Sequence, residues 1–176
     1  MPIAGHHLLD REIHREPRAG ARRLGAEAAV GDPTAPNGKL LALDPDGPPA
    51  QRPRTVSSGW HNPFAFAFAP DGTLFVADNV GGPGEERLAI GNAGPAPVVL
   101  GSLPAHSVPS GLAVLPDGRL AVCTYLARTL RTSRVVGRVA LPDPVPLASD
   151  CSIGVIALTG QRLAYANEGA IRTIEP

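Results

Sequence analysis

The sequence predicts an all-β fold: a partial β-propeller of about three four-stranded blades, roughly half of a six-bladed ring. Three observations lead to this prediction. A sequence motif recurs after 46 residues, each repeat contains several strand-like segments, and turn-forming residues are abundant. Of the 176 residues, 20 are glycine and 20 are proline, and both are spread along the chain. A chain of this kind must reverse direction often, as short antiparallel strands do.

The repeat is clearest where residues 66–78 (FAFAPDGTLFVAD) match residues 112–124 (LAVLPDGRLAVCT). A weaker third copy covers residues 153–167, with Thr159 and Gly160 in place of the Asp-Gly turn. Proline fixes φ before the turn, and Asp-Gly accepts the positive φ of a tight hairpin. Each copy therefore predicts two strands joined by a short turn, and the alternation of apolar residues supports this.

Two further strand-like segments follow each of the first two hairpins. Four strands in a repeat of about 45 residues are typical of a propeller blade. The additional strands are predicted over residues 39–43, 54–57, 87–90, 97–100, 128–131, 138–141 and 170–174. The chain then supplies the outer half of one blade, two whole blades and three strands of another. Propellers close with about four to eight blades, so we expect either part of a larger ring or a homodimer that closes it.

The first residues differ from the rest. Residues 1–37 show no blade pattern and are treated as a separate N-terminal segment, in which residues 18–30 are compatible with a short helix. The propeller part covers residues 38–176. The first thirty residues mix arginine with acidic residues and lack an apolar core, so no signal peptide is visible. The compartment stays open: cytoplasmic for the sequence as it stands, periplasmic or secreted for a longer one.

The charge balance excludes some partners. The chain has 16 basic and 16 acidic residues, which cancel. No global field would then attract nucleic acid or an anionic membrane. No apolar run approaches the roughly 18 residues of a membrane span. We therefore expect a small molecule or a protein as the partner, with no nucleic acid and no membrane span.

Cys123 and Cys151 are the two cysteines. Their separation excludes a zinc site of the CxxC kind. Both lie in apolar, strand-like surroundings, so we expect two buried free thiols. The alternative is a disulfide between neighbouring elements, which would require an oxidising compartment.

In a propeller, two sets of loops surround the channel on one face. We call the loops before the innermost strands the approach loops, here residues 58–63, 105–109 and 148–152. The other set joins the second and third strands of each blade. Polar residues of both sets should meet at one rim: His61, Asp78, Asn79, His106, Asp150, Asn167 and Glu168. Their oxygens suit Ca²⁺, and a histidine beside them suits a general base. The alternative is that they cap turns and bond their own loops.

Two stretches resemble a known family. Residues 31–47 (GDPTAPNGKLLALDPDG) and 59–72 (GWHNPFAFAFAPDG) are followed by ADN at 77–79 and EER at 85–87. This order resembles the glucose/sorbosone dehydrogenase family, six-bladed propellers that oxidise sugars with pyrroloquinoline quinone and bind Ca²⁺. The resemblance covers roughly residues 31–90. The later blades are equally similar to NHL-repeat and gluconolactonase-type propellers.

The resemblance implies site residues. His61 stands where the family has a cofactor-contacting arginine in its G-x-R-N-P motif, and an imidazole cannot make a bidentate guanidinium contact. The cofactor-binding candidates are His61 and Asn62, and the catalytic candidates are His61 and Asp150. In the family's manner Ca²⁺ would use backbone carbonyls near residues 80–83. The metal candidates are Asp78, Asn79, Gly81, Pro83, Asn167 and Glu168.

Three function hypotheses follow. The first is a partial relative, active or inactive, of the quinone-dependent sugar dehydrogenases. It would oxidise a sugar hydroxyl or aldehyde carbon by hydride transfer, with pyrroloquinoline quinone and Ca²⁺ as cofactors. The second is a non-enzymatic, NHL-like scaffold that binds a protein. The third is a metal-dependent lactone hydrolase, with one metal held by Asp78, Asp150, Asn167 and Glu168.

Overall fold

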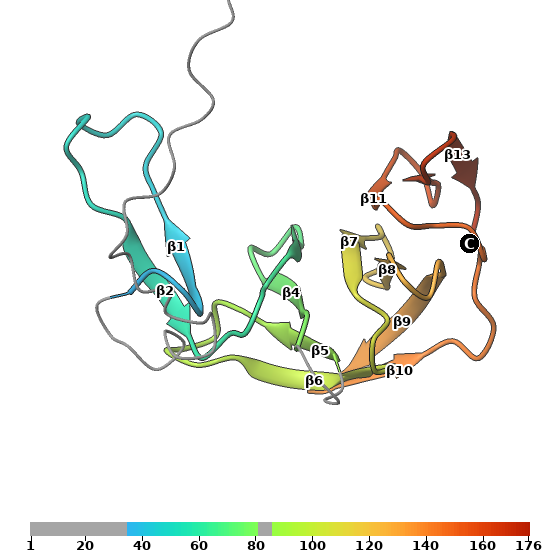
Figure 1. The fold of residues 1–176 in the computed structure, drawn as a ribbon, viewed down its shortest axis with the longest axis horizontal. Helices are drawn as coiled ribbons and strands as arrows, with labels where there is room; N and C mark the ends of the chain where they lie inside the picture. Colours follow the sequence, from blue (N-terminus) through green and yellow to red (C-terminus); the bar gives the residue numbers. More distant parts are fainter. Residues whose placement is uncertain (1–34, 81–85) are drawn as a thin grey trace, which may run out of the picture.

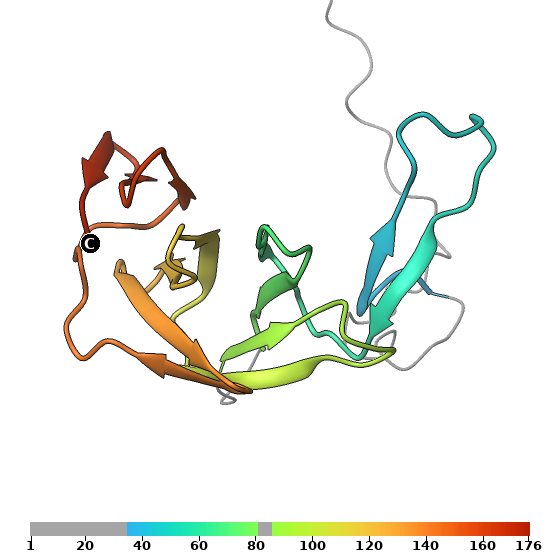
Figure 2. The same cartoon turned by 180° about the vertical axis from the view of Figure 1, so that it is seen from behind.

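The described residues of the computed structural model, 35–80 and 86–176, form antiparallel sheets that follow one another along an arc (Figure 1). Figure 2 shows the same arc from behind. Within these residues there are thirteen strands and no helix. The described residues therefore contain no helix long and apolar enough to span a membrane. The predicted all-β, partial propeller is confirmed. The N-terminal segment, with the helix considered for residues 18–30, lies outside the described residues apart from residues 35–37.

Two complete blades form the middle of the arc, each a meander of four strands in chain order. The first full blade contains β3 (Ala65–Phe68), β4 (Leu74–Asp78), β5 (Glu86–Ile90) and β6 (Val98–Leu103). The second contains β7 (Pro109–Val114), β8 (Leu120–Thr124), β9 (Leu130–Val136) and β10 (Val139–Pro142). Their first strands are joined to their second strands by the predicted hairpins, where Gly72 and Gly118 take φ values of 85° and 83°.

Incomplete sheets stand at the two ends of the arc. Before the first full blade lies a half-blade of β1 (Lys39–Ala42) and β2 (Arg54–Ser58). After the second full blade comes the last blade, with β11 (Gly154–Ala157), β12 (Leu163–Ala166) and β13 (Ile171–Ile174). The predicted sequence of a half-blade, two whole blades and three strands is therefore confirmed.

One strand differs clearly from its prediction. The third strand of the second full blade was expected at residues 128–131, but β9 begins at Leu130 and continues to Val136. The reason lies in the preceding turn. Arg128 takes a positive φ of 54°, and the Thr124 hydroxyl lies 2.9 Å from that of Thr129 and accepts the Thr129 N–H at 3.1 Å. Residues 124–129 therefore form the turn, and β9 starts two residues later than predicted.

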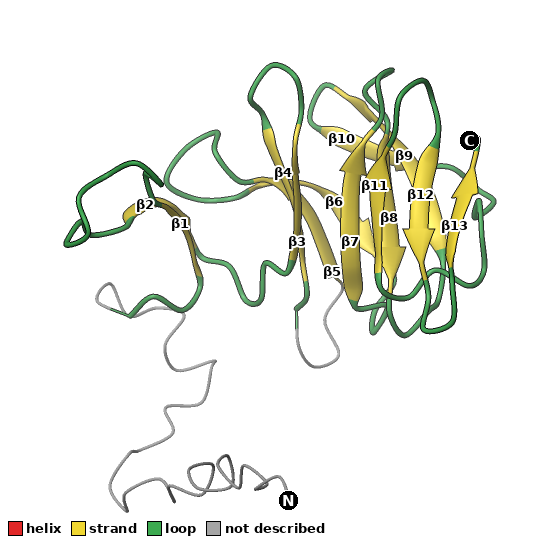
Figure 3. Cartoon of the chain, turned by 90° about the horizontal axis from the view of Figure 1, so that it is seen from above, coloured by secondary structure: helices red, strands yellow, loops and turns green. Residues whose placement is uncertain are grey.

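The sheets pack face to face, as Figure 3 shows for the two full blades and the last blade. We call the side of a blade that faces the following sheet its forward face, and the opposite side its backward face. The first interface joins Ala65, Phe75, Ala77 and Leu88 to Leu112, Leu120 and Val122. The second joins Ala113, Ala121, Cys123 and Leu130 to Val155, Leu163 and Tyr165. The second strand of each full blade has neighbours on both of its faces, which explains why β4 and β8 are buried at every position.

The half-blade packs against the first full blade through tryptophan. Trp60 is fully buried among Leu74, Val76 and Ala89, with Leu40 of β1 beside it. Its indole N–H donates to the hydroxyl of Ser57 at 2.9 Å. The one tryptophan of the chain thus closes the interface that precedes the first full blade.

Glycine permits the closest approach between the second full blade and the last blade. A Cβ at Gly111 of β7 would lie 2.6 Å from the backbone nitrogen of Val155 and 2.7 Å from Cα of Gly154. Both atoms are backbone, so they cannot rotate away. Only a residue without a side chain lets these two innermost strands pack so closely.

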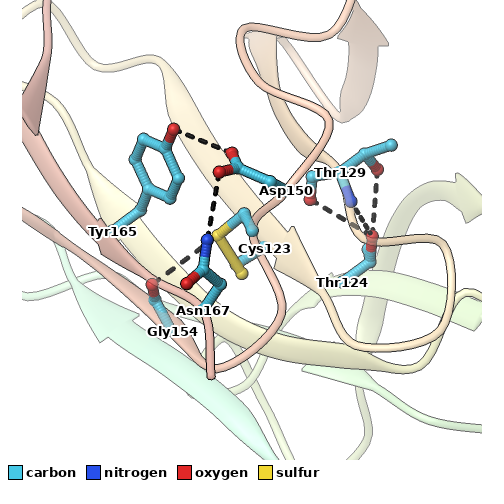
Figure 4. Close-up of a disulfide and its surroundings, with 8 residues drawn as sticks. Cys123, Thr124, Thr129, Asp150, Gly154, Tyr165 and Asn167 are labelled. Atoms are coloured by element: carbon cyan, nitrogen blue, oxygen red, sulfur yellow. Dashed lines mark hydrogen bonds between the residues drawn. A yellow bond between two sulfur atoms is a disulfide. The ribbon is translucent and has the colours of Figure 1, made fainter. Parts of the chain in front are cut away.

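The two cysteines form a disulfide, so the expectation of two free thiols is wrong. Cys123 lies near the end of β8, where Figure 4 shows its disulfide bond. Its partner Cys151 lies in the approach loop before β11. Their Cα atoms are 5.6 Å apart, and both residues are fully buried. The reason is the blade interface, which places the forward face of β8 against that loop. A separation of 28 residues along the sequence gave no sign of this contact.

We predict that Gly111→Ala lowers the free energy of unfolding by about 1–3 kcal/mol, because the new methyl group meets backbone that cannot yield. The matched control is Gly154→Ala, at which a Cβ meets no atom within 4 Å. Its effect should stay within about 0.5 kcal/mol. Urea unfolding of both variants measures the difference, and equal losses would contradict the close approach.

We also predict that replacing both cysteines by alanine lowers the free energy of unfolding by about 3–4 kcal/mol, the loop-closure value for a separation of this size. A reducing agent should lower the stability of the natural chain by a similar amount. It should leave the double variant unchanged. A natural chain that is insensitive to the reductant, and accessible to thiol reagents without it, would show that no disulfide is present.

Candidate functional site

The two sets of rim loops enclose a cavity of about 400 Å³, which we call the rim pocket. It takes residues from the two full blades and the last blade. The lining consists of Asn62, Phe64, Asn79, Val108, Pro109, Ser110, Tyr125, Ser152 and Ile153. Approach loops and loops between second and third strands therefore meet at one rim, as the repeat predicted.

The rim pocket is mainly apolar. Phe64, Tyr125 and Ile153 are 64%, 51% and 53% exposed and offer flat or branched apolar surface. Among the described residues, no charged side chain lines the pocket. Its polar groups include the amides of Asn62 and Asn79. The buried Ser110 hydroxyl has no hydrogen-bond partner within the described part of the chain. Such a lining suits an uncharged, flat portion of a ligand.

Asp78 fixes the loop that forms one wall of the pocket. Its side chain is fully buried at the end of β4. Oδ1 accepts the backbone N–H of Asn62 at 2.7 Å, and the N–H of His61 lies 3.2 Å from both carboxylate oxygens. Arg87 of β5 donates through Nε to Oδ2 at 3.1 Å and also through Nη2. Arg87 reaches on to the carbonyl of Gly59 at 3.1 Å. The carboxylate is therefore engaged by its own blade.

His61 is held in the same cluster. Its Nδ1 lies 2.8 Å from the backbone carbonyl of Asn79. A carbonyl oxygen only accepts, so Nδ1 carries the proton of this hydrogen bond. The bond fixes the ring orientation and makes Nε2 the acceptor nitrogen of the neutral ring. Four sequence candidates, His61, Asn62, Asp78 and Asn79, are thus brought together.

Glu86 is a second buried carboxylate beside this cluster, only 1% exposed. Its Oε2 accepts the N–H of Val80 at 2.6 Å. The Asn79 amide, with its nitrogen turned toward Glu86, donates to both carboxylate oxygens at 3.3 and 3.1 Å. Asn79 is therefore positioned by Glu86. The metal candidates Gly81 and Pro83 lie outside the described residues.

Asp150 belongs to a different cluster, on the last blade (Figure 4). Its Oδ1 accepts the Tyr165 hydroxyl at 2.9 Å, and its Oδ2 accepts the Asn167 amide at 3.0 Å. Arg172 of β13 forms an ion pair with Oδ2 at 3.0 Å. Burial, followed by the adjacent Asp150, raises the pKa of Tyr165, so the phenol keeps its proton and donates.

The other two rim candidates of the last blade, Asn167 and Glu168, are also engaged. Asn167 Oδ1 accepts the N–H groups of Gly169 and Ala170, both at 2.9 Å. Glu168 pairs with Arg128 at 2.8 Å, and both side chains are 52% exposed. A backbone hydrogen bond at Glu168, and then the adjacent Arg128, lower the pKa of Glu168. Among residues 35–80 and 86–176, no group of three or more His, Cys, Asp or Glu residues is arranged to hold a metal.

Several rim residues were not candidates from the sequence. Phe64 and Tyr125 line the pocket from loops and Ser110 lines it from β7, and no spacing rule singled them out. Arg87 had a usable signal. It stands directly opposite Asp78 in the β4–β5 pairing, and opposite charges at such positions attract. The hairpin register could have paired them.

Comparison with known proteins finds similarity in structure alone. No protein-family model and no curated protein match the chain. The PQQ-bound form of aldose sugar dehydrogenase from Streptomyces coelicolor aligns with a TM-score of 0.63 and 18% identity, over 82% of this chain and 53% of that one. A glucose dehydrogenase aligns with a TM-score of 0.54 and 20% identity, over 73% and 47%.

The chain therefore has the fold of part of a sugar dehydrogenase propeller, which confirms at the level of fold the resemblance seen in the sequence. It spans about half the length of the solved structures it matches.

We predict that Asp78→Asn lowers the free energy of unfolding by about 2–3 kcal/mol, because it leaves Arg87 beside a neutral group and weakens the bonds to the approach loop. Asp150→Asn is the matched control. Its side chain is 38% exposed, so solvent screens its ion pair and the loss should remain below about 1 kcal/mol. Thermal and urea unfolding compare the two. A loss for Asp150→Asn as large as that for Asp78→Asn would contradict the assignment.

Proposed function

We propose that this chain forms about half of a quinone-dependent sugar dehydrogenase propeller, with the rim pocket as part of the cofactor and substrate site. One observation carries the proposal. A pocket assembled from three successive blades lies at the channel rim of a fold shared with a PQQ-bound aldose sugar dehydrogenase. The substrate class is an aldose or a related sugar with an oxidisable carbon.

The lining fits the ring system of pyrroloquinoline quinone. Phe64, Tyr125 and Ile153 provide apolar contact for a flat ring, and aromatic side chains stack well on such surfaces. The amide of Asn62 is the donor for one of its carbonyl oxygens. The cofactor's carboxylates need cations, and none lines this side among the described residues. The proposal therefore requires cations from residues that do not line the rim pocket.

Within this proposal His61 and Asn62 keep the roles expected from the sequence. When bound, the quinone supplies the acceptor for a hydride from the sugar carbon. His61 takes the hydroxyl proton, so that loss of the hydride and the proton converts the C–OH group of the sugar into a carbonyl group. Histidine is the side chain that most often serves as a general base. Asp78 and Arg87 act as positioning residues, since they hold the loop that carries His61 and Asn62.

Asp150 has a narrower part in the proposal. Three donors already bond its carboxylate, which favours a positioning role in the last blade over proton transfer. Ca²⁺ remains a proposed cofactor because the family resemblance implies it. Its ligands would have to include groups outside the described residues, such as Gly81 and Pro83. The separation of Asp78 from the cluster of Asp150 and Asn167 gives the lactone hydrolase no support.

The second candidate function is an NHL-like scaffold that binds a protein partner. The observation that favours it is the rim pocket itself, which is apolar and lacks a cation among the described residues.

We further propose that the chain works in an oxidising compartment, the periplasm or outside the cell. The buried disulfide supports this location, because such bonds persist where thiols are oxidised.

We predict that the protein binds pyrroloquinoline quinone in the presence of Ca²⁺ and then reduces a dye when given an aldose. Tyr125→Ala should weaken quinone binding about tenfold, since a stacking surface is lost. Leu126→Ala is the matched control: Leu126 is 59% exposed but does not line the pocket. Its binding should equal that of the natural chain. Absorbance titration measures binding independently of turnover.

A further variant tests the position of His61. His61→Arg restores the guanidinium that the family carries there, and we expect tighter quinone binding than with histidine. Failure of the natural chain to bind quinone, with no dye reduction across a panel of sugars, would contradict the dehydrogenase proposal. Unchanged binding in Tyr125→Ala would show that the quinone does not use the rim pocket.

A further inference from the structure

The two ends of the arc expose faces that are buried inside it. Strand pairing makes the blades directly comparable, because Phe68, Val114 and Ala157 each stand opposite the leucine that begins the second strand. By this alignment the last blade has a forward face like those of the two full blades. Its members are Ile156, Ala164, Ala166 and Ile171.

The forward face of the last blade is exposed where its equivalents are buried. Ile171 is 80% exposed, whereas the equivalent Leu88 and Leu130 are 1% and 0% exposed. Ile156 is 61% exposed, whereas the equivalent Ala113 is 4% exposed. A face of the kind that packs in both internal interfaces therefore lacks a covering sheet among the described residues.

At the other end of the arc, the backward face of β3 also exposes apolar side chains. Phe66 is 58% exposed, whereas the equivalent Leu112 and Val155 on the backward faces of the later blades are 6% exposed. Phe68 on the same face is 63% exposed. The half-blade reaches Leu74 and Val76 of the second strand through Trp60 and Leu40. It leaves the innermost strand β3 uncovered.

We infer that a second copy of this chain docks head to tail, with the forward face of its last blade on the backward face of β3. Ile156 and Ala164 of the incoming copy then meet Phe66 and Phe68. Inside the chain, the equivalent Ala67 and Val114 both pack against the first interface. Each copy carries both faces. The docking partner is thus another copy of the same chain, and the contact between copies is apolar, like the two interfaces inside the chain.

The span of the arc argues for two copies. The chain covers about half of each solved structure whose fold it shares, 53% and 47%. A head-to-tail contact closes into a ring when its rotation completes a turn, and otherwise continues as a filament. An arc of half a turn closes with two copies. Closure also removes exposed apolar surface, which otherwise favours aggregation.

Light scattering on a sizing column tests this inference over a range of concentrations. The natural chain should give a mass near twice 18.1 kDa. Ile156→Arg and Phe66→Glu should each give 18.1 kDa, because a charge enters an apolar contact. Both residues are exposed within one copy, so their circular dichroism should match that of the natural chain. Val145→Arg is the matched control, 70% exposed on neither end face, and should remain a dimer.

A rescue variant sharpens the test. The double variant Ile156→Arg with Phe66→Glu should recover the dimer, since the two charges then face each other across the contact. A natural chain of 18.1 kDa at every concentration, a dimer that Ile156→Arg leaves intact, or an open series of larger masses would overturn the inference. The result is separate from the proposed function, because mass is measured without quinone or sugar.

Discussion

The carboxylate of Asp78 holds the approach loop of the first full blade, and the rim pocket takes its shape from this attachment. A buried carboxylate needs hydrogen bonds or a cation to compensate for the loss of water. Here the loop amides and Arg87 provide both. The cost of leaving this group unpaired fixes where His61 and Asn62 can lie. The rim is therefore specified by electrostatics, and the blades behind it by packing.

The other blades attach their approach loops at the same place with different groups. In the second full blade the backbone N–H of Tyr125 donates to the carbonyl of Val108 at 2.7 Å. In the last blade Asp150 accepts from Tyr165 and Asn167, and the disulfide anchors the adjacent Cys151. The attachment is thus a property of the repeat, while its chemistry varies. The residues that line a pocket between blades can therefore differ while the approach loops stay attached at the same place.

The architecture was predictable because its signals are local. Hairpins marked by Asp-Gly and strands of alternating residues gave the blade order, and only the start of β9 was displaced clearly, by a turn at Thr124 and Thr129. The site was less predictable. The repeat correctly placed the polar rim residues at one end of the sheets. It did not reveal that Asp78, Asp150 and Asn167 bond their own loops, because such contacts depend on distances across strands.

The disulfide and the pocket walls show the same limit. Cys123 and Cys151 meet only because two blades pack, and Tyr125 faces the pocket only because its turn follows β8. The exposure of side chains in the structure, in contrast, gives information that the sequence repeat does not contain. Phe66 and Leu112 have the same place in the repeat, yet one is open and the other buried. That difference identifies which interfaces within the described arc still lack their second half.

Hydrogen–deuterium exchange at the amides of His61 and Asn62 tests the central claim most directly, since both donate to Asp78. For the natural chain we expect exchange as slow as in β4. In Asp78→Asn we expect fast exchange at these two amides and unchanged exchange in β11 and β12. Fast exchange at both amides in the natural chain would contradict the claim that a buried carboxylate holds the loop and thereby shapes the rim.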